Sequence, residues 1–423
     1  MEKSNKDRLK IAIIGSGISS LTSAFILSKK HDVFLYEKND YIGGHTHTHK
    51  INDSSKDLNV DSGFIVYNEN TYPNFIKLLN ILKVESQKTS MGFSVKSNNR
   101  DFEYSGNSIN SMFAQKRNIL NISFLRMLYD IIKFNKKSNN MINTLATDIS
   151  LEDYLNELKV SKYFKDNYII PMGAAIWSTS PKLMLKMPAI FFVRFFQNHG
   201  LLDVSQSPQW WVIKNGSKQY VKKIIKPFEN NISLNDEVLS VKRTNNKIHL
   251  TFKNKSKVFD KVVIGTHSNQ ALKILEDPSN DEINILNKIK YQKNIATIHT
   301  DESILPKRKL AWSSWNYLLD RNQINDVTLT YNMNILQSLK SKKTFCVSIN
   351  AFDNIDPDKI IKKITYHHPM FTNESVNAQK LKNKICGTNN TYYCGAYWGY
   401  GFHEDGVNSS LDVCKKLGLT LDD

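Results

Sequence analysis

The first 37 residues alternate between short apolar runs and one stretch with helical spacing. Lys10–Ile14 is an apolar, β-branched run, which predicts a buried strand that stops at Gly15. Apolar side chains recur at helical spacing in Ile18–Ser28, and Asp32–Tyr36 predicts a second strand that ends before Glu37. The three elements fit within about 30 residues, which is typical of a β-α-β unit.

Helical spacing dominates the middle of the chain, and short alternating strands return after Ile232. Helices are predicted over Thr71–Leu82, Arg117–Lys137, Leu151–Leu158 and Val160–Ile170. Strands are predicted over Val238–Lys242, Ile248–Phe252, Val258–Gly265, Ile295–Thr300, Asp326–Met333, Thr344–Ile349 and Tyr392–Trp398. A glycine-rich segment then leads into a final helix predicted over Val407–Leu417.

The turn between the first strand and the first helix has the spacing of a dinucleotide-binding fingerprint. Gly15 permits a tight turn, Gly17 lets a pyrophosphate approach the backbone, and Ser20 is small enough for close helix–strand packing. The start of the helix offers free N–H groups to that anion. Glu37 lies 20 residues beyond Gly17, where its carboxylate can accept hydrogen bonds from ribose hydroxyls.

A second glycine pair selects the nucleotide. Gly43 and Gly44 begin six residues after Glu37. A double glycine at this distance resembles the FAD-binding oxidoreductases, in which the pair passes close to the flavin nucleotide. NAD-only dehydrogenases do not share this element, so FAD is the expected cofactor.

Four blocks of sequence resemble the flavin-containing amine oxidoreductase superfamily, which includes amine oxidases, phytoene desaturases and protoporphyrinogen oxidases. The blocks are Ile11–Gly44, Val60–Phe64, Lys214–Val221 and Tyr392–Leu411. Nearly the whole chain is also similar to a bacterial subgroup described as predicted NAD/FAD-binding proteins. The resemblance implies an α/β fold, in which an α+β substrate domain is inserted into an FAD/NAD(P)-binding Rossmann-like domain of the glutathione reductase type.

This resemblance implies that the chain crosses several times between two domains. The FAD-binding domain is expected to comprise residues 1–95, 206–272 and 389–423. The substrate domain is expected to have a mainly helical part, residues 96–205, and a sheet part, residues 273–388.

The resemblance also implies a set of cofactor contacts. They are Gly15, Gly17, Ile18, Ser19, Glu37, Lys38, Gly43, Gly44, His45, Thr46, Gly63, Val238, Gly406 and Val407. Gly406 and Val407 are expected at the start of the last helix, where backbone N–H groups would bind a flavin carbonyl. None of the four cysteines lies in a covalent-flavin motif, so FAD is expected to be non-covalent.

Two departures from the family pattern argue against a direct transfer of amine oxidase chemistry. His45 stands where many members have an arginine that meets the FAD phosphates. Ala396 stands where many members have an acidic residue.

Polar and aromatic residues near these blocks are candidates for the chemistry. His403 lies beside Glu404 and Asp405 and could act as an acid or base, while the two carboxylates could instead cap the following helix. His267 follows a strand end that would face the ligand crevice, with a surface loop as the alternative. Tyr400 is the third catalytic candidate. The substrate-binding candidates are Trp312, Trp315, Asn316 and Trp398, with core packing as the alternative.

Charge and composition bear on partners. The 423 residues carry a formal net charge of +17, but the lysines are scattered and no nucleic-acid motif occurs, so no nucleic-acid partner is expected. His45, His47 and His49 alternate as metal ligands can on a strand, yet they have no acid or thiol partner nearby, so no metal is predicted. No apolar run reaches the length of a secretory signal or a membrane span, so a cytoplasmic location is expected.

The basic, amphipathic Arg117–Lys137 segment has two interpretations. It could lie on an anionic membrane surface, as a peripheral contact at the inner membrane face. It could also pack within its domain with a charged outer face, which is the favoured interpretation.

These patterns predict an FAD-dependent oxidoreductase of the amine oxidase or desaturase type. The substrate, a small molecule or lipid, would lose a hydride to flavin N5 and gain a C=N or C=C bond. A hydrophobic substrate, such as a lipid acyl chain or an isoprenoid, is favoured over a small amine. A flavin isomerase or mutase without net redox change, and a non-catalytic FAD-binding partner protein, remain alternatives.

Overall fold

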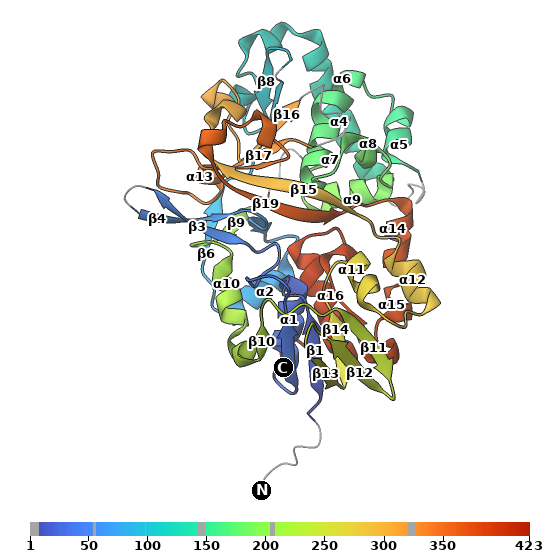
Figure 1. The fold of residues 1–423 in the computed structure, drawn as a ribbon. Helices are drawn as coiled ribbons and strands as arrows, with labels where there is room; N and C mark the ends of the chain where they lie inside the picture. The colour runs from blue at the N-terminus through green and yellow to red at the C-terminus, as the bar shows by residue number, and fades with distance from the viewer. Residues whose placement is uncertain (1–7, 54–55, 98, 143–148, 204–207, 320–326) are drawn as a thin grey trace.

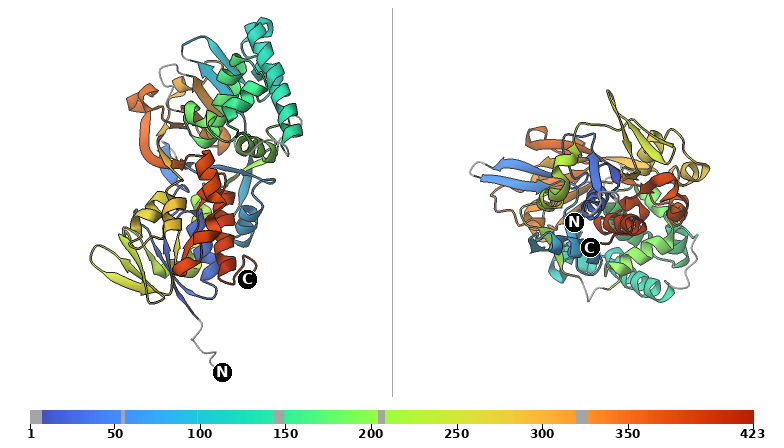
Figure 2. Two further views of the ribbon diagram at one scale, coloured as in Figure 1. Left: turned by 90° about the vertical axis from the view of Figure 1, so that its right-hand side faces the viewer. Right: turned by 90° about the horizontal axis from the view of Figure 1, so that it is seen from below.

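The computed structural model describes residues 8–53, 56–97, 99–142, 149–203, 208–319 and 327–423. These residues form two bodies, one above the other, and both ends of the chain lie at the lower body (Figure 1). Each body has its own hydrophobic core. A parallel sheet forms the centre of the lower body, and a larger mixed sheet with helices beside it forms the upper body (Figures 1 and 2).

The lower sheet confirms the β-α-β unit predicted at the N-terminus. Its five parallel strands follow the order β10 (Ile232–Ser233), β2 (Asp32–Tyr36), β1 (Lys10–Ile14), β14 (Lys261–Ile264) and β20 (Thr391–Tyr393). Helices α1 (Ile18–Leu27) and α16 (His403–Lys416) pack together on one side, and a small antiparallel sheet of β11 (Ser240–Thr244), β12 (Lys247–Thr251) and β13 (Ser256–Phe259) lies on the other (Figure 2). Because both faces are covered, the central strands are continuous apolar runs.

Two predicted strands of the lower body are divided or shortened in the structure. Val258–Gly265 is not one strand: it divides at Asp260 into β13 and β14, which belong to different sheets. The Asp260 carboxylate accepts a hydrogen bond from the Lys10 N–H at 2.7 Å and so ties this corner to β1. The strand predicted over Tyr392–Trp398 ends at Tyr393, and a 3₁₀ turn, Ala396–Trp398, follows it.

The last helix begins four residues earlier than predicted. Its N-cap is Phe402, whose backbone N–H donates to the Asp405 carboxylate at 2.9 Å. Gly406 therefore lies inside the helix, and its N–H already bonds the Phe402 carbonyl at 3.1 Å. The free amides at this helix start belong to His403, Glu404 and Asp405 rather than to Gly406 and Val407.

The upper sheet has seven strands. Their order is β19 (Ile360–Pro369), β15 (Tyr291–His299), β18 (Cys346–Ile349), β17 (Leu329–Asn332), β16 (Trp315–Leu319), β7 (Phe93–Ser97) and β8 (Phe102–Ser105). All neighbours are antiparallel except β16 and β7. The sequence pattern missed β19, because its burial does not alternate: it is an edge strand that pairs only with β15 in the described part of the chain.

The helices of the upper body stand beside this sheet. They are α3 (Ile109–Met112), α4 (Ile122–Met141), α5 (Leu151–Glu157), α6 (Lys162–Phe164), α7 (Ile170–Trp177), α8 (Pro181–Leu185) and α9 (Ala189–Asn198). The helix predicted from Arg117 starts at Ile122, because the Asn121 side chain caps it by accepting the Phe124 N–H at 3.2 Å. A separate 3₁₀ turn, Lys116–Leu120, precedes it.

Smaller elements complete the two bodies. They are the hairpin β3 (Thr48–Asp53) and β4 (Lys56–Asp61), the sheet of β5 (Val66–Asn68), β9 (Trp210–Ile213) and β6 (Ser86–Thr89), and the helices α2 (Pro73–Ile81), α10 (Lys218–Ile224), α11 (Ser268–Ile274), α12 (Asn280–Leu286), α13 (Met333–Leu336), α14 (Asn373–Gln379) and α15 (Lys382–Ile385). The domain boundary expected at residue 95 falls inside β7, all of which pairs in the upper sheet. Of the described helices, none combines the length and apolar character needed to cross a bilayer.

Candidate active site between the two bodies

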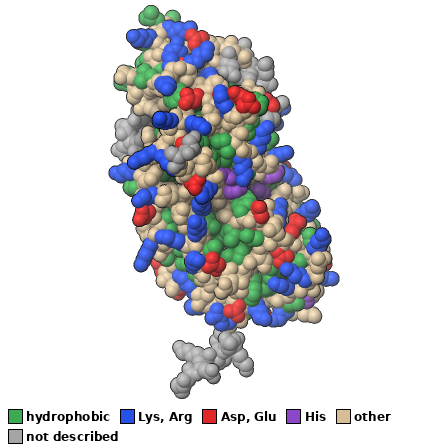
Figure 3. All heavy atoms as spheres, turned by 60° about the vertical axis from the view of Figure 1, so that its left-hand side comes forward, with side chains coloured by type: hydrophobic (Ala, Val, Ile, Leu, Met, Phe, Trp, Pro, Cys, Tyr) green, Lys and Arg blue, Asp and Glu red, His purple; other side chains and the backbone are tan. Residues whose placement is uncertain are grey.

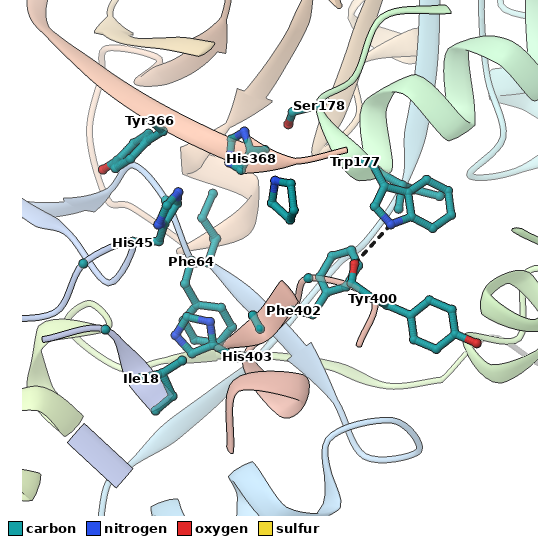
Figure 4. A pocket seen from close by; sticks show the side chains of 18 of the residues that line it. Ile18, His45, Phe64, Trp177, Ser178, Tyr366, His368, Tyr400, Phe402 and His403 are labelled. Atoms are coloured by element: carbon teal, nitrogen blue, oxygen red, sulfur yellow. Dashed lines mark hydrogen bonds between the residues drawn. The ribbon is translucent and has the colours of Figure 1, made fainter. Parts of the chain in front are cut away.

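A cavity of about 1420 Å³ lies where the two bodies meet. Its lower end is formed by the carboxyl ends of β1, β2 and β14, where ligands bind in open parallel sheets. Its upper end reaches residues of β16, β17, α4 and α7. Figure 4 shows His45, Tyr366 and His368 on one side of the space and Trp177 and Tyr400 on the other.

Most of the sequence-predicted cofactor residues line this cavity. They are Gly15, Gly17, Ile18, Ser19, Glu37, Lys38, Gly43, Gly44, His45, Gly63 and Val238. Gly15 has a φ of 93°, so the turn after β1 requires glycine. Gly17 is extended, and a Cβ added there would meet no atom within 4 Å, which leaves open space beside its backbone.

Ser16, which the fingerprint leaves as a free position, organises the nucleotide end. Its hydroxyl donates to the Glu37 carboxylate at 2.7 Å and accepts the Gly43 N–H at 3.2 Å. The second Glu37 oxygen accepts the Asn39 N–H at 2.9 Å. Ser16 therefore links the two motifs that the sequence identified separately, and it fixes the orientation of the ribose-binding candidate.

The double glycine packs directly on the dinucleotide turn. A Cβ on Gly44 would lie 3.1 Å from the Gly17 Cα, and Gly44 has a φ of 59°. The Val60–Phe64 block supports this loop from behind, since a Cβ on Gly63 would lie 2.1 Å from the His45 carbonyl oxygen. Backbone thus contacts backbone at two places, which leaves no room for side chains.

Three of the predicted cofactor residues do not line the cavity. The Thr46 hydroxyl lies behind it and bonds His403 Nε2 at 3.0 Å and the Tyr220 hydroxyl. Gly406 lies in the α1–α16 contact, because a Cβ there would be 2.7 Å from the Ile18 side chain. Val407 is fully buried in the lower core. These residues support the cofactor end through packing.

His403 lies at the bottom of the cavity and is held from several sides. Its ring stacks on Phe64 with centroids 3.5 Å apart, and Nε2 lies 3.1 Å from the Tyr220 hydroxyl. Burial, together with the nearby His45 ring, holds the pKa of His403 well below its usual value. His403 is therefore a neutral imidazole at neutral pH.

The two carboxylates after His403 serve as helix caps, the alternative weighed from the sequence. Asp405 caps its own helix, and burial raises its pKa to about 6. Glu404 instead caps α2, because its two oxygens accept the N–H groups of Asn74 at 3.0 Å and Phe75 at 2.8 Å. Its side chain thus fastens the last helix to α2.

The Glu404 cap gives a testable prediction. Replacing Glu404 with alanine removes both acceptors and is expected to cost about 2 kcal/mol of unfolding free energy, and glutamine, which keeps one acceptor, about 1 kcal/mol. Chemical denaturation measures both values. Flavin content and turnover per bound flavin should stay near wild type, and a large loss of turnover in a fully folded glutamine variant would instead assign Glu404 to the chemistry.

Three histidines surround the middle of the cavity, and the sequence identified two of them. His45 and His267 come from the predicted loops, and His368 comes from the unpredicted strand β19. The His45 ring lies 4.8 Å from Tyr366, 5.3 Å from His368 and 6.2 Å from His267 between centroids. Figure 3 shows histidine side chains gathered where the two bodies meet.

Burial and mutual repulsion lower the pKa of each of these rings. The pKa falls to about 4 at His45 and to about 3 at His267 and His368, with desolvation as the largest cause in each case. All three are therefore neutral at pH 7. His45 Nε2 is buried without a hydrogen-bond partner among the described residues, so it is free to bond a ligand.

A chain of amides fixes the tautomer of His368. The Ile295 N–H donates to Asn350 Oδ1, the Asn350 NH₂ donates to Asn294 Oδ1 at 2.8 Å, and the Asn294 NH₂ donates to His368 Nδ1 at 2.7 Å. Nδ1 is thus an acceptor, and in the neutral ring Nε2 carries the proton. His368 presents a fixed N–H donor at the cavity wall.

The remaining predicted residues divide between the cavity and its surroundings. His267, Tyr400 and Trp315 line it, and the Tyr400 carbonyl accepts the Trp177 indole N–H at 3.2 Å (Figure 4). Trp312, Asn316 and Trp398 do not line it. Trp312 bonds the Pro306 carbonyl at 2.8 Å, and the buried Asn316 amide is used by backbone and Ser94 partners.

The upper end of the cavity is an apolar arm. It is lined by Met91, Met112, Ile131, Met172, Ile176 and Leu201, together with the aromatic side chains of Phe93, Tyr104, Tyr168, Trp177, Trp315 and Tyr331. Carboxylates are scarce: the described lining residues include only Glu37 and Glu237, near the nucleotide turn, and the exposed Asp203. The two ends of the cavity therefore suit different chemistries, an anionic polar ligand below and an apolar one above.

Comparisons with known proteins agree with this architecture. The family described as flavin containing amine oxidoreductase matches residues 18–330, which is more than half of the chain. A comparison with curated proteins found no match.

Solved structures share the fold across their whole length. They include a CLA-producing fatty acid isomerase from P. acnes, with a TM-score of 0.70, 14% identity, and coverage of 98% of this chain and 99% of that one. Cyclohexylamine oxidase from Brevibacterium oxydans IH-35A has a TM-score of 0.69 and 13% identity over 97% and 100% of the two chains. A putrescine oxidase redesigned in its cofactor binding has a TM-score of 0.70 and 12% identity over 97% and 99%. The family match and the two-body architecture together show that this chain belongs to the flavin-containing amine oxidoreductases.

Proposed function

We propose that the protein is a non-covalent FAD enzyme that oxidises a hydrophobic substrate, with a lipid acyl chain or an isoprenoid as the preferred class. The observation that carries the proposal is the continuity of the cavity, which joins the dinucleotide turn to the apolar arm. Family membership supports the flavin, and the character of the arm supports the substrate class.

The lower end fits FAD. The open space beside Gly17 and the amides at the start of α1 would hold the pyrophosphate, and the oriented Glu37 carboxylate would hold a ribose. Lys38 and Val238 lie at the same end. When bound, FAD accepts a hydride from the substrate. All four cysteines are buried and none lines the cavity, which supports non-covalent binding.

The apolar arm favours a hydrocarbon over an amine cation. An ammonium group buried without a carboxylate partner is costly, since its charge must be desolvated. The one carboxylate of the described lining outside the nucleotide end, Asp203, is exposed. Flexible methionine side chains at Met91, Met112 and Met172 suit a long, adaptable apolar ligand.

The neutral histidines would act where substrate and cofactor meet. His368 Nε2–H can donate a hydrogen bond to a polar group of the substrate, and the unpartnered His45 Nε2 can accept or donate one. Their neutral state avoids placing a positive charge beside an apolar chain. The surrounding aromatic side chains would exclude water from the same space once substrate and cofactor are bound.

An anaerobic titration tests the proposal. Flavin-loaded protein is mixed with an unsaturated fatty acid in detergent, with an isoprenoid and with primary amines, while the visible flavin absorbance is followed and products are analysed. Bleaching by a hydrocarbon substrate and not by the amines supports the proposal. Bleaching by amines alone overturns the substrate class, and a moved double bond without bleaching identifies an isomerase instead.

Met172 offers a matched pair of variants for the same assay. Replacing Met172 with glutamate puts a carboxylate in the apolar arm and is expected to lower the rate of bleaching by the hydrocarbon at least tenfold, because the charge must be desolvated when the chain binds. Leucine at the same position keeps the arm apolar and should retain activity within about threefold. Equal losses in both variants would place the hydrocarbon outside the arm.

A further inference from the structure

Large hydrophobic side chains are exposed together at the tip of the upper body. They are Ile109, Ile119, Leu120, Ile122, Leu125, Tyr129 and Ile132, defined here as the α4 patch. Leu120 and Ile122 are 86% and 83% exposed, so they project from the surface. The tip lies at the end of the molecule opposite the chain termini (Figures 1 and 2).

Helix α4 is apolar on two opposite faces. Phe124, Met127, Ile131 and Phe134 are buried and form the inner stripe. Ile122, Leu125, Tyr129 and Ile132 repeat the same spacing two residues earlier, which is about 200° around the helix. Core packing accounts for the inner stripe, and no contact within the described chain covers the outer one.

The charged side chains of residues 109–141 are almost all positive, although Arg117 pairs with Asp101 at 3.1 Å and Arg126 with Asp130 at 3.4 Å. Between Ile109 and Met141 the sequence has Lys116, Arg117, Arg126, Lys133, Lys136 and Lys137, against the single carboxylate of Asp130. Asp130 is fully buried, where it accepts the Ser161 N–H at 2.9 Å. The Arg126 guanidinium lies 5.2 Å from the Tyr129 ring centroid, a pairing suited to a boundary between apolar and polar surroundings.

From this arrangement we infer that the α4 patch inserts into the surface of an anionic lipid bilayer. Apolar side chains on the outer stripe enter the acyl boundary, and the flanking lysines and arginines bind the lipid headgroups. A helix with an apolar face bordered by basic residues has the charge and polarity that this surface requires. Figure 3 shows hydrophobic and basic side chains side by side at the tip.

The α4 patch and the apolar arm are formed by opposite faces of the same helices. Met112 of α3 and Ile131 of α4 line the cavity, while Ile109 and Ile132 of the same helices face outward. A bilayer bound at the tip would therefore lie directly behind the arm. This step rests on the proposed function: it makes the bilayer the source of the hydrophobic substrate.

Vesicle sedimentation of the flavin-loaded protein tests the inference. The vesicles contain phosphatidylcholine alone or phosphatidylcholine with phosphatidylglycerol. Wild type is expected to sediment with the anionic vesicles and at least tenfold less with the neutral ones. The double variant Leu120→Gln, Ile122→Gln should bind anionic vesicles at least tenfold more weakly, and so should Lys133→Gln, Lys136→Gln.

The controls separate this surface from the fold, from other partners and from the substrate. Val258→Gln with Ile283→Gln removes exposed hydrophobic residues from the lower body and should leave vesicle binding unchanged. Vesicle binding that is absent in wild type, or unchanged in both patch variants, overturns the inference. A concentration-dependent dimer lost in the Leu120 and Ile122 variant, without vesicle binding, assigns the patch to a second copy instead. Vesicle binding without bleaching by any lipid would retain the surface and reject only the proposed substrate class.

Discussion

A variant with valine at Gly17 is expected to fold normally and to purify without flavin. The backbone at Gly17 is extended, with a φ of −69°, which valine adopts without strain. A side chain there meets open space in the protein, but that space is where the cofactor pyrophosphate is expected. FAD affinity should fall more than 100-fold, equivalent to about 2.7 kcal/mol.

Flavin content per chain after purification, and titration of the apoprotein with FAD, measure this loss. The matched control is Gly106→Val, because Gly106 also lines the cavity, and a Cβ there would meet only the Phe93 carbonyl oxygen, at 3.9 Å. That variant should retain its flavin. Since neither substitution clashes with the fold, the unfolding free energy of each variant apoprotein should lie within about 1 kcal/mol of that of the wild-type apoprotein. Full flavin content in the Gly17 variant would place the pyrophosphate elsewhere.

The nucleotide end was predictable because its determinants are local. The strand, the glycine turn and the helix are adjacent in sequence, and each imposes a recognisable residue type. Ser16 could not be found in this way, because its role depends on a loop that returns from Gly43. The motif determines where the turn lies. The tertiary contacts determine which of the residues that the motif leaves unspecified, here Ser16, has a role in the site.

The middle of the cavity was less predictable because distant segments build it. His368 lies on β19, an edge strand without an alternating pattern, and only its pairing with β15 brings it to His45 and His267. Asn316 shows the opposite case. It follows the cavity residue Trp315 in the sequence, but its side chain is buried in a hydrogen-bond network of the sheet. Residue type identifies candidates, and the fold selects among them.

The predicted start of the last helix was wrong for a physical reason. Helical spacing is visible from Val407 onward, whereas the first turn contains His403, Glu404 and Asp405. Polar residues in the first turn of a helix interrupt the apolar spacing by which the helix is recognised, although they stabilise its end. One of these acidic residues, Glu404, caps α2 instead of its own helix, which no local pattern indicates.

The buried histidines are expected to make the folded protein lose stability as the pH falls below about 6.5. The pKa is lowered to about 4 at His45, His47, His199 and His299, and to about 3 at His49, His267 and His368. An unfolded histidine titrates near 6.5, so below that pH the unfolded state binds more protons than the folded state. The stability that these groups contribute is present above pH 6.5 and is lost as the pH falls toward 4.

Three carboxylates oppose this trend and do not cancel it. Burial raises the pKa of Glu404, and it raises the pKa of Asp61 and of Asp405 to about 6, so the folded state takes up these protons first and gains stability as the pH falls. Seven histidines act in the other direction, each with a slope of up to about 1.4 kcal/mol per pH unit. A net loss of at least about 2 kcal/mol between pH 6.5 and pH 5 is expected.

Denaturation curves at pH 6.5, 5.75 and 5, with FAD at a constant saturating level, measure this loss. Added salt separates the cause from general repulsion in a chain of net charge +17, because about 0.5 M salt screens charges at the surface and leaves burial unaffected. His299 is fully buried and bonds Ser348. Replacing it with glutamine should reduce the slope of unfolding free energy against pH by the equivalent of up to one proton. Two results together would assign the acid sensitivity to surface charge: a pH dependence that salt removes, and the same pH dependence in wild type and the His299→Gln variant without added salt. The cavity histidines could then take up protons without loss of the fold.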